Sequence, residues 1–215
     1  LCDREARGGM MGNGAGDAGS GALVVYGDYT CALCYLLESM LAELEAAGLP
    51  VERRGVEVRP VPQPLPAPVD EQVLRHWREV VEPAARKLDV RMEMPSLWPR
   101  TRKAHELAWF ARQADRLPQT HAALYRAFFV EGRDIGRIDV LVEIAAEVGL
   151  DAEAAHIALG LDRHTDEVVR LAGMARAQGV DRLPTMVCGT ERLVGLPSRE
   201  RLRAFAMERN GRHAD

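Results

Sequence analysis

Two cysteines, Cys31 and Cys34, are separated by two residues, a spacing that lets their thiols form and break one disulfide. A short apolar run precedes them and a helical pattern follows, so the pair lies where a strand leads into a helix. Unpaired N–H groups and the helix dipole at that junction favour the thiolate of Cys31. Cys34, one turn further on, is predicted to be more buried and to attack the sulfur of Cys31 in a mixed disulfide.

A zinc half-site and a pair of inert buried thiols are the other interpretations of this spacing. Zinc needs four ligands, but neither Cys188 nor the six histidines provide a second paired spacing. The sequence therefore predicts no metal site. Cys188 is expected in the core, with a third redox thiol as the alternative, and Cys2 is expected to be an incidental exposed thiol.

The elements that would hold the cysteine pair lie at both ends of the chain. Residues 22–26 are typical of a buried strand, residues 31–47 carry apolar residues at helical spacing up to Gly48, and residues 51–61 alternate like a second strand. Prolines at every second position from 60 to 68 predict a stiff connector of polyproline character. The C-terminal part predicts strands over 184–188 and 192–194, then a helix over 199–208 capped by Ser198.

Helical patterns fill the region between these ends, with no strand-like run among them. They cover residues 71–88, 101–114, 118–130, 138–148, 152–159 and 166–178. The first strand, helix and second strand form a βαβ unit with a right-handed crossover. A block of helices then precedes a C-terminal hairpin and helix.

Composition excludes several classes of protein. The 215 residues include 28 Lys and Arg against 32 Asp and Glu, a formal net charge of −4 that leaves no positive excess for nucleic acid. No apolar run reaches the roughly 18 residues of a membrane span. Residues 1–20 are rich in glycine and predict a mobile tail. They lack the apolar core of a signal peptide, so we expect a cytoplasmic protein that binds neither nucleic acid nor membrane.

Two further groups of side chains could serve a site. His105 and Trp109 share a helix face and either line a cleft over the cysteine pair or pack between the helical block and the core. Arg100, Arg102 and Lys103 form a basic cluster that is either a solvated helix face or a site for a glutathione carboxylate.

Four segments together resemble the DsbA-like branch of the thioredoxin superfamily, across about residues 22–208. Residues 24–34 (VVYGDYTCALC) are similar to that family's strand, active-site loop and redox motif, and residues 182–187 (RLPTMV) to its cis-proline loop and following strand. Residues 102–107 (RKAHEL) and 127–136 (AFFVEGRDIG) resemble the FrnE-like and 2-hydroxychromene-2-carboxylate isomerase group.

The resemblance implies roles for individual residues. Cys31 is then the attacking thiol and Cys34 the resolving one, and the Leu183–Pro184 bond is cis, an isomer found in only about 5–6% of such bonds. Such a bond leaves the backbone of Leu183 available to an extended substrate. The catalytic set is therefore Cys31, Cys34 and Pro184, and the residues expected beside the substrate are Ala32, Leu33, Leu183, Thr185 and His105.

The dipeptide between the cysteines departs from the family pattern. The family commonly has proline after the first cysteine and often an aromatic residue or histidine before the second, where this chain has Ala32 and Leu33. A histidine there can stabilise the thiolate, so its absence predicts a less strongly oxidising protein. This fits a reductase or isomerase better than a powerful disulfide donor.

The sequence thus predicts an α/β protein with a thioredoxin fold and an all-helical insertion between the second strand and the cis-proline strand. The expected core is residues 21–66 and 162–210, with residues 67–161 as the insertion. The expected function is a thiol–disulfide oxidoreductase, as monomer or homodimer, acting on a disulfide-containing protein or small thiol. It needs no cofactor, although glutathione could be its redox partner. The alternatives are a glutathione-dependent isomerase or transferase, whose relatives usually carry serine at the first cysteine, and a non-enzymatic binding module.

Overall fold

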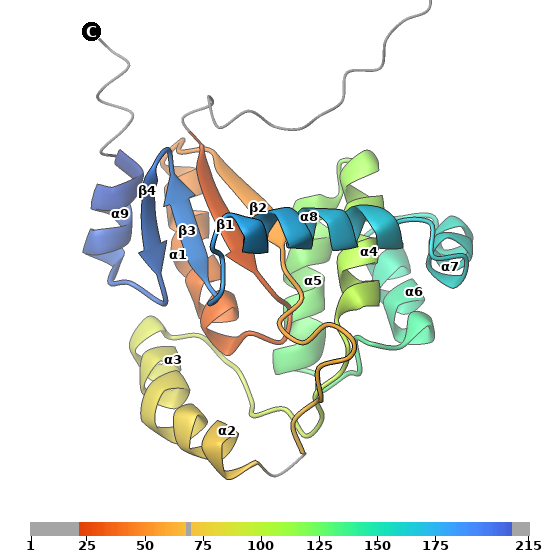
Figure 1. Ribbon diagram of the computed structural model, residues 1–215, viewed down its shortest axis with the longest axis horizontal. Coiled ribbons are helices and arrows are strands. Elements are labelled where there is room, and N and C mark those ends of the chain that lie inside the picture. The colour runs from red at the N-terminus through yellow and green to blue at the C-terminus, as the bar shows by residue number, and fades with distance from the viewer. Residues whose placement is uncertain (1–21, 68–69, 208–215) are drawn as a thin grey trace, which may run out of the picture.

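The computed structural model describes residues 22–67 and 70–207, which form a single mixed sheet with helices on both faces (Figure 1). Strand β1 (Leu23–Gly27) pairs in parallel with β2 (Val51–Gly55) and antiparallel with β3 (Thr185–Cys188), and β4 (Glu191–Val194) pairs antiparallel with β3. The resulting order is β2-β1-β3-β4. Strands distant in sequence thus meet beside β1, which leads directly into the Cys31–Cys34 pair.

Helices α1 (Ala32–Ala46) and α9 (Arg199–Met207) pack on one face of this sheet, and α8 (Thr165–Ala177) packs on the other (Figure 1). The core under α1 and α9 is apolar and includes Leu37, Leu41, Met186, Cys188 and Phe205. Cys188 is therefore a buried core residue, as the sequence predicted.

Helix α1 ends where the sequence predicted, at a glycine. Gly48 has a φ of +82°, its N–H donates to the Glu45 carbonyl, and the N–H of Leu49 donates to the Leu44 carbonyl. This pair of bonds is the Schellman motif, which satisfies carbonyls that the helix end would otherwise leave without a donor.

Helices supply the regular structure described between β2 and β3. They are α2 (Glu71–His76), η1 (Trp77–Val81), α3 (Glu82–Leu88), α4 (Arg102–Gln113), α5 (Leu117–Phe129), α6 (Ile138–Glu147), α7 (Ala152–Gly160) and α8. Their apolar faces share one core with Tyr29, Cys34 and Leu36 at the start of α1. The helical block therefore packs around Cys34, whereas Cys31 is only partly buried. The proposed division into core and insertion stays a prediction, and residues 1–20 and the final residues 208–210 lie outside the described part of the chain.

Strand β2 is shorter than the predicted strand over residues 51–61. Its partner β1 ends at Gly27, whose carbonyl accepts from the N–H of Val56, so no strand remains to pair with the residues beyond. The N–H of Val58 instead donates to the Asp28 carboxylate at 2.8 Å. The side chain of Asp28, which precedes Cys31 by three positions, thus holds the chain after β2 away from the sheet.

The helical pattern over residues 71–88 also differs from the prediction of one regular helix. A π-helical turn, η1, separates α2 from α3. Pro83 has no N–H to donate to the Glu79 carbonyl four residues earlier, and its ring clashes there in a regular α-helix. A wider turn before the proline relieves both problems.

An ion-pair network ties α4 to the end of α7, to the turn that follows it and to the start of α8. The ammonium of Lys103 binds the buried Glu106 carboxylate at 2.9 Å, the Leu159 carbonyl at 2.6 Å and the Asp162 carboxylate. Thr165 donates its hydroxyl to Glu106 at 2.6 Å. Because Glu106 is fully buried, its carboxylate cannot be hydrated. The ammonium of Lys103 and the hydroxyl of Thr165 supply the hydrogen bonds and the charge stabilisation that water would otherwise give.

The predicted basic cluster is engaged inside the protein. Arg102 pairs with the buried Glu57 at 2.7 Å, Arg100 donates to the Arg59 carbonyl at 2.6 Å, and Lys103 joins the network just described. A solvated face was therefore the wrong interpretation, because burial of Glu57 and Glu106 requires cations beside them.

Candidate functional site

Cys31 and Cys34 occupy the first turn of α1. Cys31 is the N-cap, with extended backbone, and its Sγ accepts the N–H of Cys34 at 3.2 Å. Cys31 is half-buried, whereas Cys34 is 3% exposed, and both are in the thiol form. The helix start therefore presents one sulfur outward and keeps the other inside.

The buried sulfur of Cys34 resists ionisation. Burial raises the pKa of the Cys34 thiol well above its usual value, and the hydrogen bond with Cys31 and the proximity of Cys31 raise it further. A thiol that must attack as a thiolate therefore needs a way to lose its proton.

A buried carboxylate, Asp28, organises the loop between β1 and α1. It accepts the N–H and the hydroxyl of Thr30, both at 2.7 Å, the N–H of Val58 at 2.8 Å and the hydroxyl of Thr101 at 2.7 Å, with His105 Nε2 at 3.4 Å. Burial by itself would raise the pKa of Asp28, but the contact with His105 and the bonds from Thr30 hold it below its usual value. Asp28 therefore stays ionised and links the loop to α4 and to the chain after β2.

No candidate chemistry was assigned to Asp28 from the sequence. An Asp followed two residues later by Thr is a signal for a side-chain-closed turn, and it could have identified the bonds to Thr30. The contacts with Thr101 and His105, more than 70 residues away, have no such local signal.

A groove of about 1130 Å³ borders the outer cysteine. Cys31, Ala32, Leu33 and Leu183 line it, together with residues 63–67 of the proline-rich connector and with Trp77 and Trp98. This volume exceeds the roughly 300–1,000 Å³ of pockets for small molecules. The groove therefore has room for a segment of polypeptide.

The loop before β3 contributes to this groove. The Leu183–Pro184 bond is cis, the isomer that the resemblance implied. Pro184 and Thr185 are buried, and Thr185 donates its hydroxyl to the Arg182 carbonyl at 2.6 Å. Of the expected substrate contacts, Ala32, Leu33 and Leu183 thus line the groove, whereas Thr185 lies beneath its surface.

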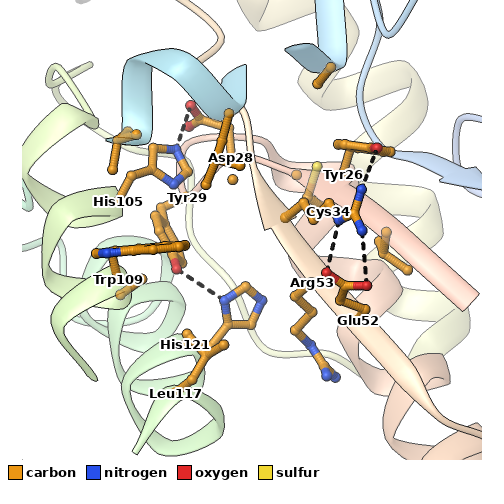
Figure 2. Close-up of a pocket in the computed structure, with 18 of the residues that line it drawn as sticks. Tyr26, Asp28, Tyr29, Cys34, Glu52, Arg53, His105, Trp109, Leu117 and His121 are labelled. Atoms are coloured by element: carbon orange, nitrogen blue, oxygen red, sulfur yellow. Dashed lines mark hydrogen bonds and ion pairs between the residues drawn. The ribbon is translucent and has the colours of Figure 1, made fainter. Parts of the chain in front are cut away.

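A second, smaller cavity of about 180 Å³ borders the inner cysteine (Figure 2). Cys34 lines it together with Tyr29 from the loop, Arg53 from β2, and His121 and Tyr125 from α5. His105 and Trp109 of α4 line this cavity and are absent from the lining of the groove at Cys31. Sequence analysis offered His105 and Trp109 as residues lining a cleft near the cysteines, but it missed Arg53, His121 and Tyr125, because these come from segments far apart in the chain.

Hydrogen bonds join several polar side chains along the cavity. The Tyr29 hydroxyl lies 3.1 Å from His121 Nδ1, and His121 Nε2 lies 2.8 Å from the Glu38 carboxylate, whose other oxygen accepts from Arg53 at 2.9 Å. Burial by itself would raise the pKa of Glu38, but His121 and Arg53 hold it below its usual value. Burial raises the pKa of Tyr29 far above its usual value, so its hydroxyl stays protonated.

A parallel βαβ unit, an antiparallel strand after a cis-proline and a Cys-x-x-Cys at a helix start together define a thioredoxin fold with a dithiol site. The model of the DSBA-like thioredoxin domain matches residues 22–205, and the chain belongs to this family. Membership supports a thiol–disulfide oxidoreductase at the level of the family.

Individual relatives share most of the chain's length. The uncharacterized protein YwbO of Bacillus subtilis strain 168 is 29% identical over 183 residues, which cover 82% of this chain and 90% of that protein. A solved 2-hydroxychromene-2-carboxylate isomerase has a TM-score of 0.74 at 19% identity, with 89% of this chain and 97% of that chain covered. The cytosolic disulfide reductase DsbM from Pseudomonas aeruginosa, solved with GSH, has a TM-score of 0.63 at 25% identity, with 89% and 99% covered.

Residues 22–67 and 70–207 contain no cluster of three or more His, Cys, Asp or Glu arranged to hold a metal ion. In the same residues, no helix has the length and apolar character needed to cross a membrane.

Proposed function

We propose that the chain exchanges disulfides through Cys31 and Cys34, with Cys31 as the attacking thiol. The observation that carries this proposal is the contrast between the two sulfurs, which share one helix turn. Cys31 borders an open groove at the N-terminus of α1, where backbone N–H groups favour an anion, while Cys34 is buried one turn further on.

The exchange proceeds in two steps. The thiolate of Cys31 attacks a substrate disulfide, which forms a mixed disulfide and releases one substrate thiolate. Cys34 then loses its proton and attacks Cys31 Sγ, which forms the Cys31–Cys34 disulfide and releases the second substrate thiolate. Two electrons pass from the dithiol to the substrate, so no metal or organic cofactor is required. The reverse sequence oxidises a substrate dithiol.

The groove at Cys31 suggests the form of the substrate. We propose that an extended segment lies between Leu183 and the proline-rich connector, beside Ala32 and Leu33. Arg59 and Arg182 also line the groove, and neither forms an ion pair within the described residues. They suit a carboxylate near the reacting disulfide, whether on an acidic peptide or on a small thiol such as glutathione.

Titration against glutathione redox buffers tests the function. The wild-type chain should form one reversible intramolecular disulfide, and Cys34→Ser should trap mixed disulfides that Cys31→Ser cannot form. Cys188→Ser, which removes a core thiol, should leave the reduction potential unchanged. If Cys31 and Cys34 form no reversible disulfide, the proposal is wrong.

A glutathione-dependent isomerase is the second candidate, favoured by the TM-score of 0.74 with 2-hydroxychromene-2-carboxylate isomerase. In that case glutathione itself would be the reacting thiol and Cys34 would not be needed. Tight glutathione binding and isomerase turnover that survive Cys34→Ser would support the isomerase over the oxidoreductase.

A further inference from the structure

We propose that the cavity behind Cys34 is a proton exit, in which Tyr29 and His121 carry away the proton that Cys34 must lose before it attacks the mixed disulfide. The proposal rests on the exchange function above and adds the residues that make its second step fast. Figure 2 shows the Cys34 sulfur, the Tyr29 hydroxyl and the His121 ring around one space.

The second step needs such an exit because of where Cys34 lies. Its side chain is 3% exposed and packs in the core, so bulk water cannot reach the thiol directly. The cavity has room for several water molecules at the ~10–15 Å³ that one occupies by this measure. A water there can accept from the thiol and donate to a polar group on the wall.

Most polar groups near the Cys34 thiol are already committed. The Asp28 carboxylate accepts from Thr30 in its own loop, from Val58 after β2 and from Thr101, and it contacts His105. Tyr125, whose pKa is raised by burial and by the nearby Cys34, donates its hydroxyl to the Asp28 carbonyl at 3.2 Å. Neither group offers a site for another proton.

Tyr29 and His121 remain, and their geometry suits a relay. The Tyr29 hydroxyl can donate to His121 Nδ1 at 3.1 Å, while Nε2–H donates to Glu38 at 2.8 Å. A proton arriving at the Tyr29 oxygen from water displaces the hydroxyl proton to Nδ1, so Tyr29 never becomes an anion. The imidazolium that results lies against the ionised Glu38.

The surroundings of His121 also allow the proton to leave. Tyr29, Glu38 and Tyr125 contact His121 directly. The other titratable or charged residues that line the cavity are Tyr26, Asp28, Cys34, Glu52, Arg53, Arg54, His105, Arg112 and Arg170. The side chains of His121 and Glu38 are 13% and 21% exposed, so the pair touches solvent while Cys34 does not. Solvent then returns a proton to the departing substrate thiolate, which balances the step.

The two chemical steps can be separated in one experiment with the aromatic disulfide dithiobis(nitrobenzoate). Cys31 of the reduced chain releases one aryl thiolate in a bimolecular phase, and Cys34 releases the second in a unimolecular phase. In His121→Gln, which keeps a polar side chain but cannot take the proton, the second phase should slow about 100-fold near neutral pH. Its rate should then rise in proportion to hydroxide, and added imidazole should partly restore it.

Controls distinguish the relay from a loss of fold and from a failure of the exchange function. His156→Gln, on the exposed surface of α7, should keep the wild-type rates, and the first phase should be unchanged in every variant. Tyr29→Phe removes the connecting oxygen and should slow the second phase as His121→Gln does. A second phase with wild-type rate and pH profile in either variant would overturn the relay. A wild-type chain that lacks the first phase would overturn the exchange function itself.

Discussion

Replacement of Asp28 by asparagine tests whether this carboxylate holds the active-site loop in place. Its two oxygens accept from Thr30, Val58 and Thr101, which belong to three separate segments of the chain. The asparagine carbonyl can replace one oxygen. The asparagine NH2 group that takes the place of the other oxygen cannot accept a hydrogen bond, so the buried backbone N–H beside this group loses its acceptor.

The expected loss of unfolding free energy follows from the number of hydrogen bonds that Asp28 accepts. A hydrogen bond to a charged group contributes about 1.5–3 kcal/mol, and a buried donor left without a partner costs about 1–3 kcal/mol. The hydroxyl of Thr101 can rotate to accept from the new amide, but the N–H of Val58 cannot. We therefore expect Asp28→Asn to lower the free energy of unfolding by about 3 kcal/mol.

Urea unfolding measures this loss. At a slope of about 2 kcal/mol per molar urea, 3 kcal/mol moves the midpoint down by about 1.5 M. Asp70→Asn is the matched control, because Asp70 accepts two N–H groups at the start of α2 and asparagine is an equally good N-cap. A loss below about 1 kcal/mol for Asp28→Asn, or one equal to that of the control, would refute the reasoning.

The stabilities of the wild type and of Asp28→Asn can also be compared as a function of pH. The pKa of Asp28 in the folded chain lies below the ordinary value of 3.8, so its stabilising contribution is present above that pH. It is lost as the pH falls through the folded-state pKa and the carboxylate takes up a proton. The stability difference between wild type and Asp28→Asn should therefore be full near neutral pH and shrink in acid. A constant difference would show that the charge of Asp28 is not the cause.

Three further substitutions test packing and pairing, each by urea unfolding. A Cβ at Gly55 would lie 2.3 Å from His105 Nδ1, so Gly55→Ala should destabilise the fold by at least about 2 kcal/mol. Gly173, inside α8, has open space around it, and Gly173→Ala should stabilise by up to about 1 kcal/mol. Lys103→Met leaves the fully buried Glu106 without its cation and should cost about 3 kcal/mol. Equal effects of the two glycine substitutions, or a silent Lys103→Met, would contradict these contacts.

The site separates the two cysteines into two environments. Cys31 borders a groove that can hold a polypeptide segment, and Cys34 borders a small polar cavity. Under the two proposals above, the substrate approaches one sulfur while protons leave the other by a different route. This arrangement needs no charged residue between the cysteines, which agrees with the apolar Ala32 and Leu33.

Local patterns in the sequence were sufficient for most of the elements. The glycine after α1, the cap at Ser198 and the spacing of apolar residues depend on neighbours within a few positions, and the structure confirms them. The longer second strand was a wrong prediction, because a strand ends where its partner ends and the partner is not local. The regular helix over residues 71–88 was wrong because the effect of Pro83 on its preceding turn was overlooked.

The sequence by itself determined the dithiol, its place at a helix start and the family pattern around it, because these features depend on residues within one strand and one helix turn. Only the tertiary structure decided what surrounds each sulfur. His105, His121 and Glu38 reach the same cavity from α4, α5 and α1, and Asp28 receives Thr101 across 73 positions of sequence. Hydrogen bonds and burial depend on groups a few ångströms away in space, and the number of residues between two groups in the sequence does not determine that spatial distance.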